Sequence, residues 1–372
     1  MLKKLLSSSS HLPGIPSEAT EIYAASANSL VAKVNSLLDR HPQRDELIGR
    51  NPVTLMHDNH RNHVDFMTTV FRLNSYELLA RTLPWIYRAY HARGFSYDYF
   101  LEELRAWKIA VLEAFGETTS KHEILAVYDW MIQHHAEVVS LAESGEGLAF
   151  SVDHETTEIQ QIFLSLLLHG DGRGCLKLID QSIQTPDELK KFYLDIVWPS
   201  LYTIGKLWET DQISVAEEHL ATAIVGRVMA ALYPRFMQVP ISRGRALVSA
   251  CPNEFHEVGA RMVADFLELD GWDVTFLGAN TPASEIVSIL KRQKSFFIAL
   301  SVATIFNLDK ARQLIELIRA DAELSGIKIL IGGLAFQEMT DLWQQLGADA
   351  CAPDAQQAVD VADRWWLAAG AG

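Results

Sequence analysis

The residues best suited to chemistry in this sequence are a histidine, His256, and the acidic residue two positions before it, Glu254. A neutral imidazole is a common ligand of transition metals, cobalt among them. A carboxylate at this spacing can accept the second ring N–H, which fixes the tautomer and raises the basicity of the ligating nitrogen. A loop histidine alone is usually a surface residue, so the spacing of its companions decides between the two interpretations.

Those companions form an ordered pattern. Gly259 completes an acidic-x-His-x-x-Gly sequence, Ser301 follows it after 41 positions, and Gly332-Gly333 follow the Ser-x-Ala triplet after 28 more. The pattern resembles the cobalamin-binding motif of methionine synthase, methylmalonyl-coenzyme A mutase and their relatives, which is acidic-x-His-x-x-Gly, Ser-x-Leu and Gly-Gly. The resemblance implies that cobalamin binds base-off, with His256 as the lower ligand to cobalt.

Each element of the pattern has an expected role in holding the cofactor. Ser301 would place its hydroxyl against the displaced nucleotide base. Gly332-Gly333 would leave a channel without side chains for the nucleotide tail, and Gly259 would let a helix approach closely. Two positions depart from the motif: glutamate stands at 254 where aspartate is usual, and alanine at 303 where leucine is usual. Glutamate keeps the charge and alanine changes only packing, so the prediction stands.

The elements that must position these residues are predicted from the apolar pattern after Pro240. Short apolar runs rich in β-branched residues alternate with amphipathic helical stretches, which indicates a parallel, doubly wound, Rossmann-like sheet of about five strands. Ligands of such sheets bind outside the carboxyl ends of the strands. The expected strands are 246–249, 274–277, 296–301, 327–331 and 348–352, and the expected helices are 257–269, 284–291, 308–320, 336–346 and one ending near Trp366.

A second group of functional residues precedes the sheet. Trp208 is followed by nine residues and then by Glu218-His219. This spacing resembles the W-x9-EH signature of CarH-type, adenosylcobalamin-dependent photoreceptors, and the likeness covers about residues 155–372. The resemblance implies that Trp208, Glu218 and His219 cover the adenosyl group on the upper face of the cofactor.

In that family light breaks the cobalt–carbon bond, a helical bundle shifts against the sheet domain, and the oligomer changes. This implies a light-dependent homo-oligomer here. The family also has a histidine after the tryptophan that captures cobalt in the lit state, whereas this chain has Glu209. The lit state is therefore expected to differ, with water as the cobalt ligand.

The chain is predicted to be multidomain, with an all-α domain at 1–150, a four-helix bundle at 151–240 and the Rossmann-like domain at 241–372. Apolar and aromatic residues recur at helical spacing through the first region, and the break at 144–147 suggests its end. In the second region, Thr185-Pro186 is a typical helix start. The bundle would cap the upper face of the cofactor.

The first region is rich in aromatic residues interleaved with arginines, a composition typical of a core but also suited to a flat ligand with propionates. A helical domain ahead of a CarH-like module resembles the photocobilins, in which a globin-like domain holds biliverdin. The resemblance implies a biliverdin site, which we place at Trp85, Tyr87, Arg88 and His91, with haem as the alternative. The bilin would be non-covalent, because no cysteine precedes Cys175.

Ten of the 13 histidines lie between His11 and His154. His57, His60 and His63 are spaced by three residues, which places them near one helix face and could form a metal site. A polar surface is the alternative interpretation.

Composition excludes several classes of partner. A formal charge of −15 opposes phosphate binding, so no direct contact with nucleic acid is expected, nor is a basic helix-turn-helix domain evident. No apolar stretch suits a signal peptide or a membrane span, and three scattered cysteines fit a reducing compartment, so a cytoplasmic protein is expected.

Three functions of different class remain open. A photoreceptor is favoured over an enzyme. A corrinoid methyl carrier would share the bundle and the histidine motif, but its upper face must open to two enzymes, which Trp208 and Glu218-His219 would hinder. A radical enzyme would need a substrate-holding region of barrel size, which the sequence does not suggest.

Overall fold

A computed structural model of the chain describes residues 1–116, 121–145, 157–337, 339 and 341–370. These form two compact units, Met1–Val152 with Glu209–Gln212, and Asp153–Trp208 with Ile213–Gly372. The expected boundary near residue 150 and His154 both lie outside the described residues, so the three predicted domain limits stay predictions.

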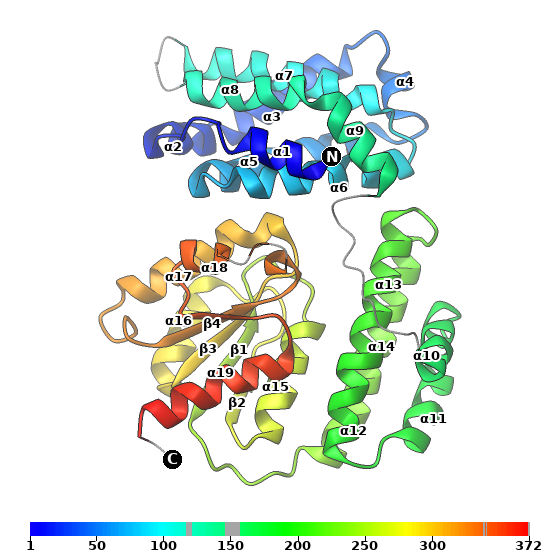
Figure 1. Cartoon of the computed structure of the whole chain (residues 1–372), viewed down its shortest axis with the longest axis vertical. Coiled ribbons are helices and arrows are strands. Elements are labelled where there is room, and N and C mark those ends of the chain that lie inside the picture. Colours follow the sequence, from blue (N-terminus) through cyan, green and yellow to red (C-terminus); the bar gives the residue numbers. More distant parts are fainter. Residues whose placement is uncertain (117–120, 146–156, 338, 340, 371–372) are drawn as a thin grey trace. The chain divides into compact units, whose positions relative to one another are not determined.

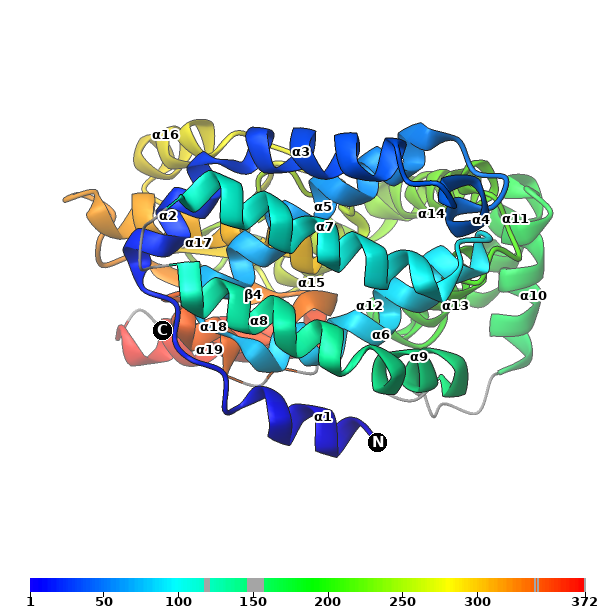
Figure 2. The ribbon, with the colours of Figure 1, turned by 90° about the horizontal axis from the view of Figure 1, so that it is seen from above.

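The first unit consists of helices throughout the residues described before position 146, in agreement with the predicted all-α region (Figure 1). The helix α7 lies beside α3 and α8 (Figure 2). A globin-like arrangement stays a prediction. The bounds are α1 Leu2–Ser9, α2 Ser17–Ala25, α3 Ala27–Asp39, α4 Arg44–Ile48, α5 Val53–Leu73, α6 Tyr76–Ala92, α7 Tyr97–Phe115, α8 Lys121–Gln133 and α9 His135–Ser144.

Much of the aromatic content of this unit is core. The fully buried side chains include Tyr23, Phe66, Tyr99, Trp107 and Tyr128. Their hydroxyl and indole groups find partners inside the core, as buried polar groups must. For example, the Tyr23 and Tyr128 hydroxyls lie 2.7 Å apart.

An acidic side chain, Glu103 on α7, is buried in this core at 2% exposure. Asn59 Nδ2 and Trp107 Nε1 each donate to its Oε1 at 3.2 Å. Burial nonetheless raises the pKa of Glu103 to about 7. No cation of the described residues forms a close ion pair with it; His63 Nδ1 is 4.0 Å away, and burial lowers the pKa of that imidazole to about 3.

We therefore expect Glu103→Gln to stabilise the protein in a pH-dependent way. A carboxyl whose folded pKa is raised from 4.5 to about 7 favours folding at low pH and loses that contribution as pH rises through 7. The free energy of unfolding of the variant should exceed that of the wild type by about 2 kcal/mol more at pH 8 than at pH 5. Urea unfolding at the two pH values measures this difference, and an equal gain at both would contradict the burial argument.

In the second unit, the helices before the sheet form four rods, and the third rod runs without a gap through α12, the π-helical η1 and α13. Figure 1 shows these helices beside the sheet. Thr185 and Glu188 form the capping box that starts this third rod, with Pro186 in its first turn, as the sequence predicts. Ser214 and Glu217 cap the fourth rod in the same way. The bounds are α10 Glu158–Leu168, α11 Gly172–Ser182, α12 Pro186–Lys191, the π-helical segment η1 Phe192–Val197, α13 Trp198–Glu209 and α14 Val215–Phe236.

The sheet has five parallel strands in the order β2-β1-β3-β4-β5, with helices on its faces, as expected of a Rossmann-like domain. The register sets Ala250, Ser301, Gly332 and Ala352 in one row at the carboxyl edge. The strands are β1 Arg245–Ala250, β2 Asp273–Phe276, β3 Phe297–Ser301, β4 Lys328–Gly332 and β5 Ala350–Ala352; the helices are α15 Val258–Leu269, α16 Ala283–Gln293, η2 Ile305–Asn307, α17 Leu308–Ala320, η3 Leu334–Phe336, α18 Leu342–Gln345 and α19 Ala355–Ala368.

One predicted helix is wrong. Among the residues described within 336–346, the helical ones are the end of the 3₁₀ turn η3 and the four-residue α18. The Ala335 N–H donates to the carbonyl of Val302, which holds the chain at the sheet edge where a helix was expected to begin.

The bundle and the sheet share one hydrophobic core, which includes Phe163 and Val225 from the bundle and Phe266 and Val359 from the helices on the sheet. Within the described residues, no helix is both long and apolar enough to cross a bilayer.

Candidate functional site

His256 lies in the loop between β1 and α15, at the carboxyl edge of the sheet. Its side chain is 63% exposed, whereas that of Glu254 is 1% exposed. The Nδ1 atom of His256 lies 2.5 Å from Glu254 Oε1, and the backbone N–H of His256 donates to the same oxygen at 3.1 Å. Because Nδ1 is bound to the carboxylate, Nε2 is the ring nitrogen available to a ligand.

The other carboxylate oxygen of Glu254 binds the loop that follows β3. Oε2 accepts from the backbone N–H groups of Ala303 and Thr304 at 3.0 Å each. The Thr304 hydroxyl and Asn307 Nδ2 donate to the same oxygen at 3.2 and 3.0 Å. Glu254 therefore joins the histidine loop to the β3 loop, and it uses the backbone of residue 303, so the side chain type there does not affect this contact.

The charges of the pair follow from these contacts. Burial by itself would raise the pKa of Glu254, but hydrogen bonds from His256, Asn307 and Thr304 lower it to about 2. The hydrogen bond to Glu254 raises the pKa of His256 against the opposing effect of burial, and the Glu218 carboxylate adds to the rise. The carboxylate is thus held ionised, which suits it to orient an imidazole ligand.

The glycine pair at the end of β4 is required by the fold itself. A Cβ on Gly332 would meet the carbonyl oxygen of Ala352 at 2.4 Å. A Cβ on Gly333 would meet that of Val302 at 2.3 Å, and φ of Gly333 is +111°. Close backbone contacts thus account for both glycines, and the channel for a nucleotide tail stays a prediction.

Gly259 is different. A Cβ there would lie 3.7 Å from Ser301 Oγ, which is ordinary contact. Close approach of α15 to the rest of the chain, the reason given from sequence, therefore does not require glycine at this position. The same value places Gly259 next to Ser301 at the edge of the sheet.

Gly333 and Gly259 give a matched pair of substitutions. Gly333→Ala should destabilise the cofactor-free protein by about 3 kcal/mol, because the Cβ overlaps a carbonyl in a left-handed conformation. Gly259→Ala should stay within about 1 kcal/mol of the wild type. Urea unfolding without cobalamin measures both, and a Gly333→Ala protein as stable as the wild type would refute the packing argument.

The residues of the second motif lie at one end of the helix pair α13 and α14. Trp208 is half-buried in the last turn of α13, Glu218 is in the first turn of α14, and His219 follows it. Glu218 Oε2 lies 2.5 Å from His219 Nδ1, and Glu218 Oε1 accepts from the Thr222 hydroxyl at 2.9 Å. Both motifs lie in the second unit, whose bundle and sheet share one hydrophobic core.

Sequence reasoning missed Thr304 and Asn307, which fix Glu254. The only signal for them was their position just after Ser301 at the carboxyl edge of a strand. It also missed Phe255, a large apolar side chain that is 67% exposed beside His256.

The residues proposed for biliverdin all lie on α6. Tyr87 is buried and stacks on Phe100 at a centroid distance of 3.9 Å. Arg88 Nε donates to the carbonyl of Ala142, and the His91 ring stacks on that of Tyr97. Trp85 is half-buried. The bilin assignment stays a prediction.

The histidines of α5 do not form the metal site considered from sequence. His57 Nε2 contacts Asp39, His60 Nδ1 contacts Asn35 and His63 Nε2 contacts Tyr128. In the part of the chain that the structure describes, no three metal-ligating side chains converge.

The site fits a corrinoid on its own geometry. It offers an exposed imidazole with a fixed tautomer, an exposed aromatic ring beside it, and a sheet edge free of side chains at Gly332 and Gly333. Bound cobalamin would be held by His256 below and by the sheet-edge residues along its nucleotide tail.

Comparison with known proteins agrees with this geometry. Residues 244–362 match one B12 binding domain family, and residues 159–233 match a second family of the same description. The two matches support a cobalamin-binding protein.

Two curated relatives differ in role. The chain is 24% identical over 260 residues to the HTH-type transcriptional repressor CarH of Myxococcus xanthus, covering 69% of this chain and 80% of that protein. It is 23% identical over 214 residues to monomethylamine corrinoid protein 2 of Methanosarcina mazei, covering 55% and 96%. The solved monomethylamine corrinoid protein of Methanosarcina barkeri aligns at 18% identity and a TM-score of 0.48, covering 56% of this chain and 96% of that one.

Proposed function

We propose that this cobalamin-binding chain is a light-responsive regulator that takes adenosylcobalamin and changes its assembly or its partner contacts when illuminated. The observation that carries the proposal is that the two motifs belong to one compact unit, in which the helices that carry Trp208 and Glu218 share a hydrophobic core with the sheet that carries His256. One motif supplies a lower ligand, and the other supplies a cover for the opposite face.

Each residue of the proposed site has a distinct task. His256 binds cobalt through Nε2, and Glu254 holds the imidazole in the required tautomer. Trp208 covers the upper group, while Glu218 and His219 offer it a carboxylate and an imidazole. Bound adenosylcobalamin would supply a cobalt–carbon bond that visible light cleaves.

The element proposed to change is the bundle. Its helices share a core with the sheet domain, so a group held between Trp208 and His256 favours one packing of the two over another. Loss of that group removes the bias. The response is proposed to be a change in homo-oligomeric state or in a protein partner, without direct contact to nucleic acid.

Similarity to the monomethylamine corrinoid protein favours a second candidate, a methyl carrier that serves methyltransferases. Such a carrier must open its upper face to two enzymes. The half-buried Trp208 at the end of α13 argues for the first proposal.

The test reconstitutes the full chain with adenosylcobalamin in darkness and then illuminates it with green light. We expect a spectral change to a form without the adenosyl group and a shift in elution from a size-exclusion column. Trp208→Ala should lose the shift in elution, whereas the histidine-ligated spectrum of the cofactor in darkness should persist. A bond that survives illumination, with unchanged elution, would sink the photoreceptor proposal, and rapid methyl exchange with methylcobalamin would favour the carrier.

For the first unit we retain biliverdin as a proposed second chromophore, held without a covalent bond. Added biliverdin should then give a red-absorbing band, and Arg88→Ala should weaken it. Haem binding without any biliverdin band would assign the unit to the alternative ligand.

A further inference from the structure

The helical rod that ends at Trp208 contains an unusual segment. It begins as α12, widens into the π-helical η1 at Phe192–Val197, and continues as α13. Wide turns of this kind are rare and often mark functional sites. Pro199 contributes to this one, because it has no N–H to donate to the carbonyl of Asp195.

The wide segment is anchored on two sides. Phe192 packs edge-on against Phe163 of α10, with ring centroids 5.3 Å apart. The hydroxyl of Tyr193 donates to Asp265 Oδ2 on α15 at 2.8 Å, and both residues are buried, at 0% and 4% exposure. The hydrogen bond therefore ties the rod that carries Trp208 directly to the sheet domain that carries His256.

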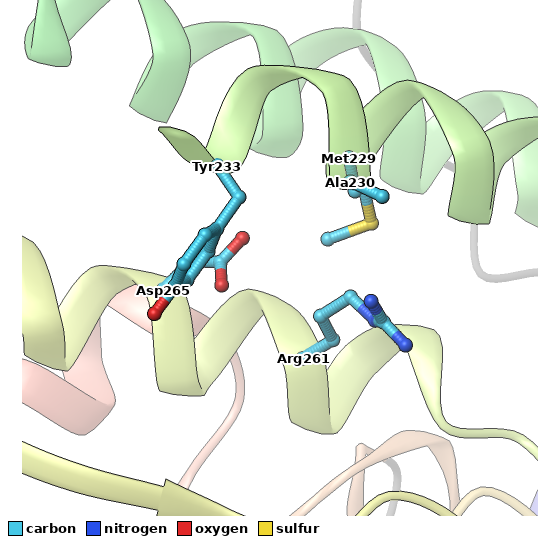
Figure 3. A pocket seen from close by; sticks show the side chains of 5 residues that line it. All are labelled: Met229, Ala230, Tyr233, Arg261 and Asp265. Atoms are coloured by element: carbon cyan, nitrogen blue, oxygen red, sulfur yellow. The ribbon is translucent and has the colours of Figure 1, made fainter. Parts of the chain in front are cut away.

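Packing beside this hydrogen bond is incomplete. A pocket of about 280 Å³ opens between α14 and α15, lined by Met229, Ala230, Tyr233, Arg261 and Asp265. Figure 3 shows Asp265 and Tyr233 together on one side of it, with Met229 and Arg261 on the other. The cation that lines the pocket, Arg261, is paired with Glu257 at 2.8 Å. The hydrogen bond between Tyr193 and Asp265 therefore borders a gap between α14 and α15 within the core that bundle and sheet share.

We propose that Tyr193 and Asp265 are positioning residues that fix the direction of α13 and so hold Trp208 over the cobalamin site. The inference rests on the proposed function, since it assigns Trp208 the role of a cover. A buried hydrogen bond between two elements restricts their relative motion, and its removal leaves a buried acceptor without its donor. The wide turn at η1 is the point at which the rod can change direction when the bond is lost.

The experiment compares Tyr193→Phe with the full-length wild type, both loaded with hydroxocobalamin. Hydrogen exchange should become about fivefold faster across α13 in the variant, while the spectrum of the lower face stays unchanged. The ratio of affinities for adenosylcobalamin and methylcobalamin should also fall about fivefold, because a loosened Trp208 no longer selects the larger upper group.

Two further variants separate positioning from general damage. Asp265→Asn keeps an oxygen that accepts from Tyr193. Its exchange rate in α13 and its ratio of affinities for the two cobalamins should stay within about twofold of the wild type. Tyr233→Phe removes a hydroxyl from the same pocket on a different helix and should leave α13 unchanged. If Tyr193→Phe does not fold, Asp265→Ala opens the same bond from the other side.

The outcomes are distinct. Exchange in α13 at the wild-type rate in Tyr193→Phe overturns the inference, as does equal acceleration in Tyr233→Phe. A wild-type protein that does not prefer adenosylcobalamin counts against the proposed function, whereas the exchange rates still decide whether the hydrogen bond positions α13.

Discussion

Replacing His256 with alanine is expected to weaken cobalamin binding by at least about 100-fold and to abolish the base-off, histidine-ligated spectrum. The imidazole is exposed, its Nδ1 is held by Glu254, and its Nε2 is left for the metal. Removal of a residue that hydrogen-bonds to a metal ligand typically lowers metal affinity 10- to 100-fold. Removal of the ligand itself should lower the affinity at least as much. Spectral titration with hydroxocobalamin measures both effects.

The matched control is His169→Ala, which removes an exposed histidine from the end of α10. It should bind cobalamin as the wild type does. A His256→Ala protein that still shows the histidine-ligated spectrum would refute the ligand assignment.

Replacing Glu254 with glutamine should weaken cobalamin binding by about 10- to 100-fold. The carboxylate accepts from five donors on two loops, counting the backbone and side chain of Thr304 separately and taking the two His256 contacts as one. A glutamine has an NH₂ group in place of one carboxylate oxygen. That NH₂ would face either His256 or the donors of the β3 loop, so it would leave N–H groups unsatisfied and release the imidazole. The dissociation constant and the histidine-ligated fraction, measured by titration, should change together.

Glu254→Asp tests the departure from the usual motif. Aspartate keeps the charge, so it should retain more affinity than glutamine despite its shorter reach. Equal affinities of the glutamine variant and the wild type would show that the carboxylate does not orient the ligand.

The strands were predictable because a parallel sheet buries both faces and gives continuous apolar runs. The strand predicted at 246–249 is observed at Arg245–Ala250, and the strand predicted at 327–331 is observed at Lys328–Gly332. The run 336–346 misled because Phe336, Met339, Leu342 and Leu346 are buried without a continuous helix among the residues described.

The contact between Glu254 and His256 was predictable, because the types and spacing of these two side chains carry its chemistry. Contacts made by backbone atoms were not predictable. The N–H groups of Ala303 and Thr304 bind the carboxylate, and no residue type encodes them. The burial of Glu103 was equally invisible, because a glutamate on an amphipathic helix is normally solvated.

The central claim is that His256 replaces the nucleotide base of cobalamin on cobalt. Electron paramagnetic resonance of the reduced Co(II) form tests it most directly, in protein grown with ¹⁵N-labelled histidine. If His256 is the lower ligand, the superhyperfine triplet of each cobalt line in unlabelled protein becomes a doublet in labelled protein. A triplet that persists in the labelled protein would mean that the cofactor's own base remains bound and would contradict the assignment.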